Sequence, residues 1–290
     1  MILCAGEALI DMLPRDTSEG AAFLPVPGGA VFNTAVALGR LGAPVAMFTG
    51  LSTDLFGERL AAALAASGVA DRAHRADRPT TLAFVTLSEG QARYAFYDEG
   101  TAGRMLTPDD LPDASGAEAL FLGGISLAVE PCADAYEALA GATDAPLMID
   151  PNVRPSFVAD AGRYRARIAR LIARATLVKL SDEDMAWLGL DADAILDMGA
   201  RALLLTEGAK GATAITARGR VHVAARPAEV VDTVGAGDTF NAGVLAALHE
   251  RGALADPSDD DLRAALDLGT RAAAVTVSRA GANPPRRDEL

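Results

Sequence analysis

Short apolar segments alternate with segments of helical periodicity along most of this chain, and this alternation restricts its fold more than any other feature. Buried strands are predicted over residues 2–5, 45–49, 119–122, 147–149, 176–179 and 202–206. Helices are predicted over residues 32–41, 54–66, 131–140, 161–174 and 183–188. Repeated strand, helix and strand units with right-handed crossovers give a mainly parallel central sheet flanked by helices on both faces. We therefore predict an α/β fold.

Two segments interrupt this alternation. Residues 80–86 and 93–98 are rich in β-forming side chains and are separated by a short polar turn, so they predict a hairpin. Together with residues 22–26 they would form a small sheet outside the main one. We expect this sheet to be a lid over a reaction that must exclude water, built from about residues 16–26 and 75–103.

The composition excludes several classes of protein. The 290 residues carry a formal net charge of −13, whereas nucleic-acid and anionic-membrane binding depend on clustered Lys and Arg. Two cysteines imply no disulfide framework, and the three histidines match no metal-ligand spacing. Residues 1–13 include Glu7 and Asp11 but no basic start, so they predict neither a signal peptide nor a membrane span. We expect a cytoplasmic protein.

The segment Asp232-Thr-Val-Gly-Ala-Gly-Asp238-Thr-Phe runs directly into an apolar helical pattern over residues 241–249. A glycine-rich turn before a helix leaves backbone N–H groups at the positive end of the helix dipole, where they bind anions. Asp238 would repel such an anion, so its presence indicates an acid or base held beside a transferred phosphate. A simple N-cap aspartate is the structural alternative, and the length of the motif favours kinase chemistry.

A second glycine pair, Gly28 and Gly29, stands before a predicted helix and is followed by Asn33. Glycine lets a ligand approach the backbone, and asparagine offers a donor and an acceptor to hydroxyl groups. Asp11 follows the first strand, and we expect it at the carboxyl end of the parallel sheet, where α/β proteins bind ligands. These residues predict contacts to a hydroxyl-rich ligand, with an ordinary helix start as the alternative.

Three further polar segments follow core strands, at residues 150–155, 179–184 and 206–211. An ordinary loop, a helix capped by Ser181 and a hairpin turn are their structural interpretations. Their functional interpretations are a substrate contact, a group of carboxylates around the water shell of Mg²⁺, and a nucleotide contact. The candidates are Arg154 for the substrate, Lys179, Thr206, Gly208, Lys210 and Gly211 for the nucleotide, and Glu183 and Asp184 for the metal, acting through water.

With these motifs in this order, the chain resembles the ribokinase-like carbohydrate kinase family, which phosphorylates a hydroxymethyl group of a sugar or nucleoside using MgATP. The resemblance rests on Gly-Gly…Asn…Leu-Gly over residues 28–42 and on Asp-Thr-x-Gly-Ala-Gly-Asp over residues 232–238. It implies one kinase domain over residues 1–290, with ATP and Mg²⁺ as cofactors. The roles that it implies are Asp238 as the base, Gly235, Ala236 and Gly237 as the backbone anion hole, Asp11, Gly28, Gly29 and Asn33 as sugar contacts, and Thr206 and Gly208 as nucleotide contacts.

The resemblance leaves two points about ions open. The family often has Asn-x-x-Glu after the strand that here ends near Lys179, whereas this chain has Ser181 and Asp184 with Glu183 between them. Which carboxylate orients the metal water is therefore undecided. A K⁺ site found in many relatives would map near residues 232–234 and stays an open alternative.

Within the family, the lid segment favours a fructokinase. Keto-acid kinases tend to place an arginine there to pair with the carboxylate of a sugar acid. This chain has Asp98 followed by Glu99, which would repel a carboxylate. We therefore expect a neutral ketohexose, with Tyr94 or Phe96 covering the sugar face. An exposed lid hairpin can also pair with its own copy, which favours a homodimer through the lid.

Several alternatives remain. Within the family they are a 2-keto-3-deoxygluconate kinase and a kinase of ribose, a nucleoside or fructose 6-phosphate, the last using Arg93, Arg104 and Arg154 as basic groups. A sugar- or nucleoside-binding protein without activity is disfavoured by Asp238. An oxidoreductase is disfavoured because no G-x-G-x-x-G follows the first strand.

Overall fold

The computed structural model describes residues 1–88 and 91–290, and the side chains of residues 85–88 and 91–94 are outside this description. Its main feature is a nine-stranded sheet. In spatial order the strands are β15 (Gly219–Val223), β14 (Ala212–Thr216), β13 (Ala202–Thr206), β12 (Leu177–Ser181), β11 (Leu147–Asp150), β10 (Ala119–Gly123), β1 (Ile2–Ala5), β4 (Val45–Phe48) and β6 (Ala70–Asp71). Neighbouring strands from β13 to β6 are parallel, and β13, β14 and β15 pair antiparallel. The predicted α/β fold is confirmed.

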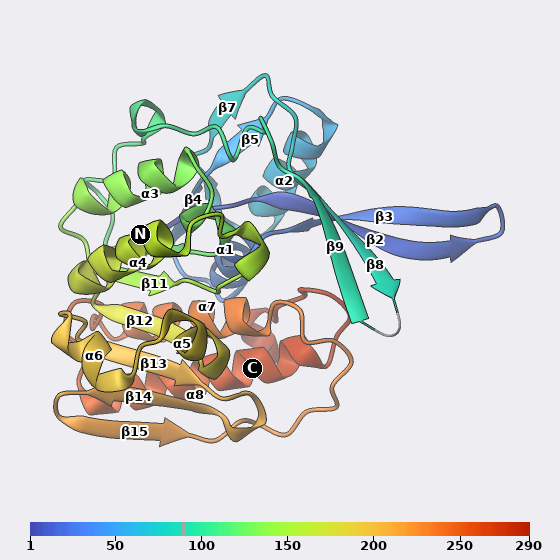
Figure 1. Ribbon diagram of the computed structural model, residues 1–290. Coiled ribbons are helices and arrows are strands. Elements are labelled where there is room, and N and C mark those ends of the chain that lie inside the picture. The colour runs from blue at the N-terminus through green and yellow to red at the C-terminus, as the bar shows by residue number, and fades with distance from the viewer. Residues whose placement is uncertain (89–90) are drawn as a thin grey trace.

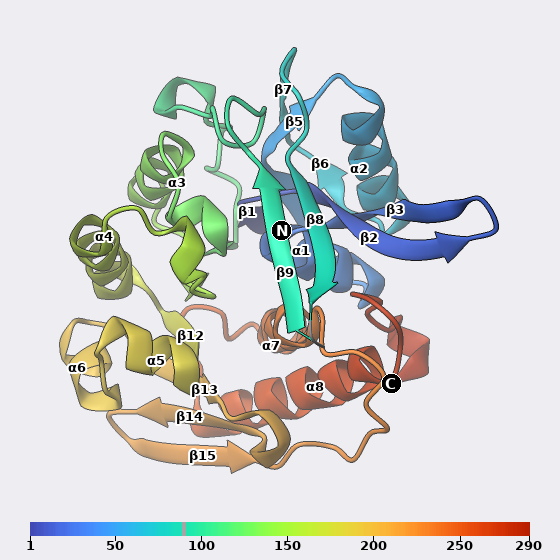
Figure 2. The same cartoon turned by 45° about the vertical axis from the view of Figure 1, so that its right-hand side comes forward.

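Helices cover both faces of this sheet (Figures 1 and 2). One face carries α1 (Ala30–Arg40), α2 (Leu55–Ala66), α7 (Ala236–Glu250) and α8 (Asp259–Val277), and the other carries α3 (Cys132–Gly141), α4 (Ala161–Arg174), α5 (Asp182–Leu188) and α6 (Ala192–Asp197). Successive strand residues point to opposite faces. In β1, accordingly, Ile2 and Cys4 pack in the core under α1, whereas Leu3 and Ala5 pack in the core under α3.

A separate four-stranded sheet stands off the main body (Figure 1). It consists of β3 (Gly20–Gly28), β2 (Leu9–Thr17), β8 (Leu82–Ser88) and β9 (Gln91–Tyr97). Its first hairpin begins at Leu9 rather than near residue 16, because β2 and β3 stay paired from Leu9 opposite Gly28 to Thr17 opposite Gly20. The apolar start of β2 resembles a core strand in sequence, which is why the sequence analysis places its boundary too late.

The predicted core strands and helices agree with the structure within two residues at each end. The sequence did not predict the antiparallel β14–β15 hairpin at the edge of the main sheet, or the small pair formed by β5 (Gly50–Ser52) and β7 (His74–Ala76). The part of the chain that the structure describes also contains five short 3₁₀ helices: η1 (Pro108–Asp110), η2 (Ile125–Leu127), η3 (Pro155–Phe157), η4 (Gly208–Lys210) and η5 (Arg287–Glu289).

Candidate active site

Asp238 lies in the first turn of α7 and is held there by α1. Its side chain is buried, and its Oδ2 accepts a hydrogen bond from Asn33 Nδ2 at 2.9 Å. Thr34 Oγ1 donates to the backbone oxygen of Asp238 at 3.2 Å. The two glycine motifs of the sequence, separated by about two hundred residues, thus meet where α1 packs against α7.

Burial raises the pKa of Asp238 from 3.8 to about 7. The hydrogen bond from Asn33 and the charge of Lys179 lower this pKa, whereas the charges of Asp150 and Glu7 raise it. A carboxyl group that titrates near neutral pH is suited to take a proton from an alcohol and to release it afterwards.

The start of α7 has the geometry of an anion site. Gly235, its N-cap residue, has φ 77°, a left-handed conformation that favours glycine. Helix geometry gives the N–H of Gly237 no acceptor inside α7, and the dipole makes this end positive. The N–H of Ala236 donates to the oxygen of Thr233 at 3.3 Å. The N–H of Gly237 is therefore a freer donor than that of Ala236.

A buried ion pair lies beneath this helix start. Lys179 Nζ lies 3.0 Å from Asp150 Oδ2, which also accepts a hydrogen bond from Asn241 Nδ2 at 2.7 Å. Burial lowers the pKa of Lys179, but the charges of Asp150 and Asp184 outweigh this effect, so the pKa is raised and the ammonium stays protonated. A Cβ atom on Gly237 would lie 3.4 Å from Lys179 Nζ. The positive charge is thus placed directly beside the anion site.

Asp11 is placed differently from the expectation. It lies within β2 of the small sheet, opposite Val26, and not at the carboxyl end of a strand of the main sheet. Its carboxylate occupies the space that a side chain on Gly28 would need, and burial raises its pKa to about 6. The small sheet therefore brings Asp11 to the glycine loop that precedes α1.

The remaining predicted substrate contacts are less closely gathered. The ring of Phe96 packs edge-on against Phe157 of η3, with centroids 4.4 Å apart. Arg154 is exposed, and its guanidinium donates a hydrogen bond to Asn152 Oδ1 at 2.8 Å, within its own loop. The side chain of Tyr94 lies outside the described residues.

A cavity of about 610 Å³ opens beside the start of α7. Ala236 and Gly237 of the anion site line it together with three of the predicted nucleotide residues, Thr206, Gly208 and Gly211. Lys179 is not in its wall, and the Lys210 side chain is 79% exposed and points toward Glu207. The sequence did not predict the rest of the wall, which includes Phe240, Thr270, Ala273, Ala274 and Val277. In the sequence these positions have the helical periodicity of core residues, so no local pattern distinguishes residues that line the cavity from residues that are packed in the core.

The two predicted metal carboxylates at the start of α5, Glu183 and Asp184, differ in burial and in hydrogen bonding. Asp184 is buried, and it accepts hydrogen bonds from the N–H of Val153 at 2.8 Å and from the N–H and Oγ of Ser181 at 3.0 and 2.8 Å. Glu183 is exposed. Within residues 1–88 and 91–290, no group of three or more His, Cys, Asp or Glu residues could hold a metal ion by itself.

Asp232, near the expected K⁺ site, accepts hydrogen bonds from the N–H groups of Val234 and Gly281 at 3.0 and 2.9 Å.

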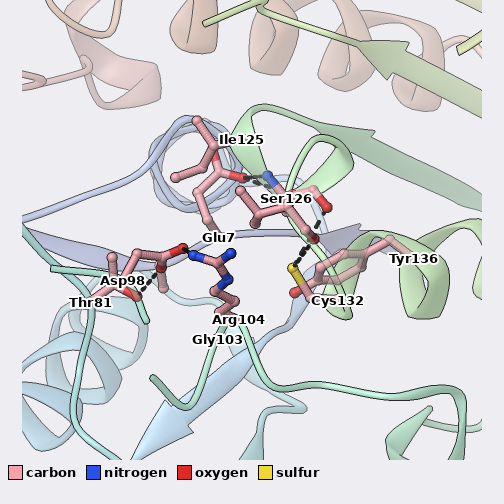
Figure 3. A pocket seen from close by; sticks show the side chains of 11 residues that line it. Glu7, Thr81, Asp98, Gly103, Arg104, Ile125, Ser126, Cys132 and Tyr136 are labelled. Carbon is pink, nitrogen blue, oxygen red and sulfur yellow. Dashed lines mark hydrogen bonds and ion pairs between the residues drawn. The ribbon is translucent and has the colours of Figure 1, made fainter. Parts of the chain in front are cut away.

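A small second cavity has Glu7, Asp98 and Arg104 in its wall (Figure 3). Asp98 is buried in its wall, accepts a hydrogen bond from Thr81 Oγ1 at 2.8 Å and pairs with Arg104 Nη1 at 3.4 Å. The expectation that Asp98 presents an unbalanced negative charge to the substrate is therefore revised, because Arg104 neutralises it. Arg104 is in turn committed to Asp98 and to the oxygen of Glu130.

A buried carboxylate in a helix start with the geometry of an anion site, between a glycine loop and a cavity of nucleotide size, is typical of an enzyme that transfers a phosphoryl group to a hydroxyl group. The chain matches the pfkB family of carbohydrate kinases over residues 1–289 and belongs to this family. It is an ATP-binding carbohydrate kinase with the ribokinase-like fold, as the sequence motifs predicted.

Several relatives carry the same activity in their names. The chain is 54% identical to a fructokinase of Rhizobium leguminosarum bv. trifolii over 260 residues, which are 86% of this chain and 79% of the relative. It superposes on fructokinase with bound ATP from Xylella fastidiosa with a TM-score of 0.87 at 30% identity, covering 97% of this chain and 93% of the other. Fructokinase from Vibrio cholerae O395, in a fructose, ADP and calcium ion bound form, gives 0.86 at 26% identity, with 97% and 94% covered. Among the described residues, no helix is long and apolar enough to cross a membrane.

Proposed function

We propose that this protein transfers the γ-phosphoryl group of ATP to a hydroxymethyl group of fructose. The observation that carries the proposal is the placement of Asp238: buried, with a pKa raised to about 7, held by Asn33, and in the same helix turn as Gly237 in the wall of the large cavity. The fructokinase relatives support fructose as the acceptor.

In the proposed reaction, Asp238 takes the proton of the attacking hydroxyl group. The hydroxyl oxygen forms a bond to the γ-phosphorus while the bond between that phosphorus and the bridging oxygen of ADP breaks, and ADP leaves with the electron pair. The N–H of Gly237 meets the negative charge of the transferred group. The ammonium of Lys179, which is paired with Asp150, lies 3.4 Å from the position that a Cβ atom on Gly237 would take. Asp11, Gly28, Gly29 and Asn33 bind the sugar, and Thr206, Gly208 and Gly211 bind the nucleotide.

The preference for a neutral sugar rests on charge. Asp11 and Glu7 are carboxylates beside the glycine loop, and Arg104 is already paired with Asp98. Leaving a carboxylate unpaired in a buried site costs several kcal/mol. The test is kcat/KM for fructose, ribose, 2-keto-3-deoxygluconate and fructose 6-phosphate, with ATP as donor. Fructose should rank first, and a higher value for 2-keto-3-deoxygluconate or fructose 6-phosphate would refute the assignment.

Mg²⁺ is the proposed divalent ion, because it binds mainly to phosphate oxygens and water and needs few protein carboxylates. When bound, it would neutralise charge on the phosphates. Glu183 is the better candidate to hold its water shell, since both oxygens of Asp184 already accept hydrogen bonds from Val153 and Ser181. Backbone oxygens near Val234 are the candidates for K⁺, because the carboxylate of Asp232 is also committed.

The small sheet is the proposed lid and the proposed dimer interface. It exposes Phe23, Leu24 and Tyr97, which are 42%, 43% and 64% accessible, and Phe23 and Tyr97 both pack against the ring of Phe84. Such an apolar patch on a thin sheet favours pairing with a second copy. Light scattering of the protein and of a Phe23→Lys variant tests this: a dimer that the substitution converts to a monomer supports it, and a monomeric protein refutes it.

A further inference from the structure

Glu7, two residues after the end of β1, joins two loops through its carboxylate. Its Oε1 accepts a hydrogen bond from the N–H of Ala30, the first residue of α1, at 3.0 Å. Its Oε2 accepts from Ser126 Oγ at 2.8 Å and from the N–H of Ser126 at 3.3 Å (Figure 3). Ser126 belongs to η2, the turn that follows β10. One side chain therefore links the glycine loop to the turn at the carboxyl end of the central strand β10.

Glu7 supplies the cap that α1 lacks. The N-cap residue of α1 is Gly29, which has no side chain to accept a hydrogen bond, and the first turn contains no acidic residue. The carboxylate of Glu7 takes the position of an anion at this positive helix end. Its backbone oxygen also accepts from the N–H of Phe32 at 3.2 Å. Two N–H groups of the first turn thus depend on one residue from another element.

The surrounding backbone leaves space for this arrangement. A Cβ atom on Gly29 would lie 2.8 Å from the backbone oxygen of Glu7, and one on Gly124 would collide with Glu7 Oε1. Both glycines have positive φ, 107° and 67°, which other residues rarely adopt. Side chains at either position would displace Glu7 from α1.

A short series of hydrogen bonds leads from Glu7 to the base. The oxygen of Gly29 accepts from the N–H of Asn33 at 2.8 Å, and Asn33 Nδ2 donates to Asp238 Oδ2 at 2.9 Å. We propose that Glu7 is a positioning residue of the sugar site: it fixes the glycine loop and the first turn of α1, and through them the orientation of Asn33 against Asp238. The inference rests on the proposed sugar site. Glu7 does not line the nucleotide cavity, so its effect should be confined to the sugar.

The test compares Glu7→Ala and Glu7→Gln in steady-state kinetics with fructose and ATP varied in turn. Glu7→Ala loses the hydrogen bonds to both loops and should raise KM for fructose about tenfold, with a lower kcat and with KM for ATP within about twofold of the wild type. Glu7→Gln keeps an acceptor for Ala30, and its amide can donate to Ser126 Oγ, whose own hydrogen is then free to be donated to the oxygen of Gly123, 2.7 Å away. It should stay within about threefold of the wild type in all three constants.

Asp160→Ala is the matched control. Asp160 caps α4 by accepting from the N–H of Arg163 at 2.9 Å, on the opposite face of the sheet and away from the site. It should lower the melting temperature without changing either KM. Ser126→Ala serves as a second variant in case Glu7→Ala does not fold, because it removes only the far anchor of the carboxylate. It should raise KM for fructose about two- to fivefold.

The outcomes separate this inference from the proposed function. Wild-type turnover of fructose tests the function, and if another sugar is the better acceptor, the same variants are measured with that sugar. An unchanged sugar KM in Glu7→Ala, or in Ser126→Ala where the former does not fold, overturns the positioning role. Equal increases in KM for the sugar and in KM for ATP also overturn it, because they indicate a general loss of structure.

Discussion

Asp238→Asn tests the assignment of the base. Asparagine has nearly the same size, and its Oδ1 can still accept the hydrogen bond from Asn33, so the α1–α7 contact should persist. It cannot take a proton from the sugar hydroxyl. Loss of a general base typically lowers the rate by about 10² to 10⁴. We expect this loss in kcat, with KM for fructose and for ATP largely unchanged.

The same substitution should stabilise the protein. Burial raises the pKa of Asp238 from 3.8 to about 7, so the folded state binds this proton more tightly than the unfolded chain. Its favourable contribution is complete below about pH 4 and is lost as the pH rises to about 7. The difference corresponds to about 4 kcal/mol. At pH 8 the Asn variant should therefore be more stable than the wild type by up to about 4 kcal/mol, and this gain should disappear near pH 4.

Two assays check this pair of effects. Coupled measurement of ADP release gives kcat and both KM values, and denaturant unfolding at pH 8 and pH 4 gives the free energy of unfolding. A matched Asp160→Asn variant, which changes an exposed cap, should retain kcat and gain no stability. An Asp238→Asn variant that folds, binds both substrates and turns over near the wild-type rate would show that Asp238 is only a helix cap and that the base lies elsewhere.

Two further predictions concern groups around the base. Since Asp238 must be deprotonated to accept a proton, kcat/KM should decrease as the pH falls below about 7. Asn33→Ala removes a hydrogen bond that lowers the pKa of Asp238, so it should move this decrease to higher pH. A pH–rate profile that is the same in the variant and the wild type would contradict the role of this contact. Glu183→Gln should raise the Mg²⁺ concentration for half-maximal rate. Asp184→Asn should mainly cost about 1–3 kcal/mol of stability, because its amide nitrogen cannot accept the hydrogen bonds that one of the two carboxylate oxygens accepts from Val153 or Ser181. Mg²⁺ titrations and unfolding curves distinguish the two, and unchanged metal dependence in both variants would mean that the cluster is only a helix start.

The sequence by itself determined the class of fold and the likeness to a kinase family. Hydrophobic periodicity is a local property, so the parallel strands and their helices could be read from consecutive residues, and α4 was predicted with the bounds that it has. The glycine-rich motif that ends at Asp238 is also local, since a turn and a helix start are specified by neighbouring residues. The late boundary of the first hairpin shows the limit of this reading. The apolar residues of β2 are equally compatible with a core strand.

Only the tertiary structure decided which groups meet and which charges are balanced. Asn33 contacts Asp238 although 205 positions separate them, and Asp98 is neutralised by Arg104 and so does not face a ligand as a free charge. Glu7 carries no motif at all, yet it caps a helix that begins 23 residues later. The energy of a buried charge depends on its partners and on exclusion from water, which are set by elements distant in the chain. The sequence motifs could therefore indicate phosphoryl transfer, whereas the packing of distant elements determines which partners and how much burial each charged side chain has.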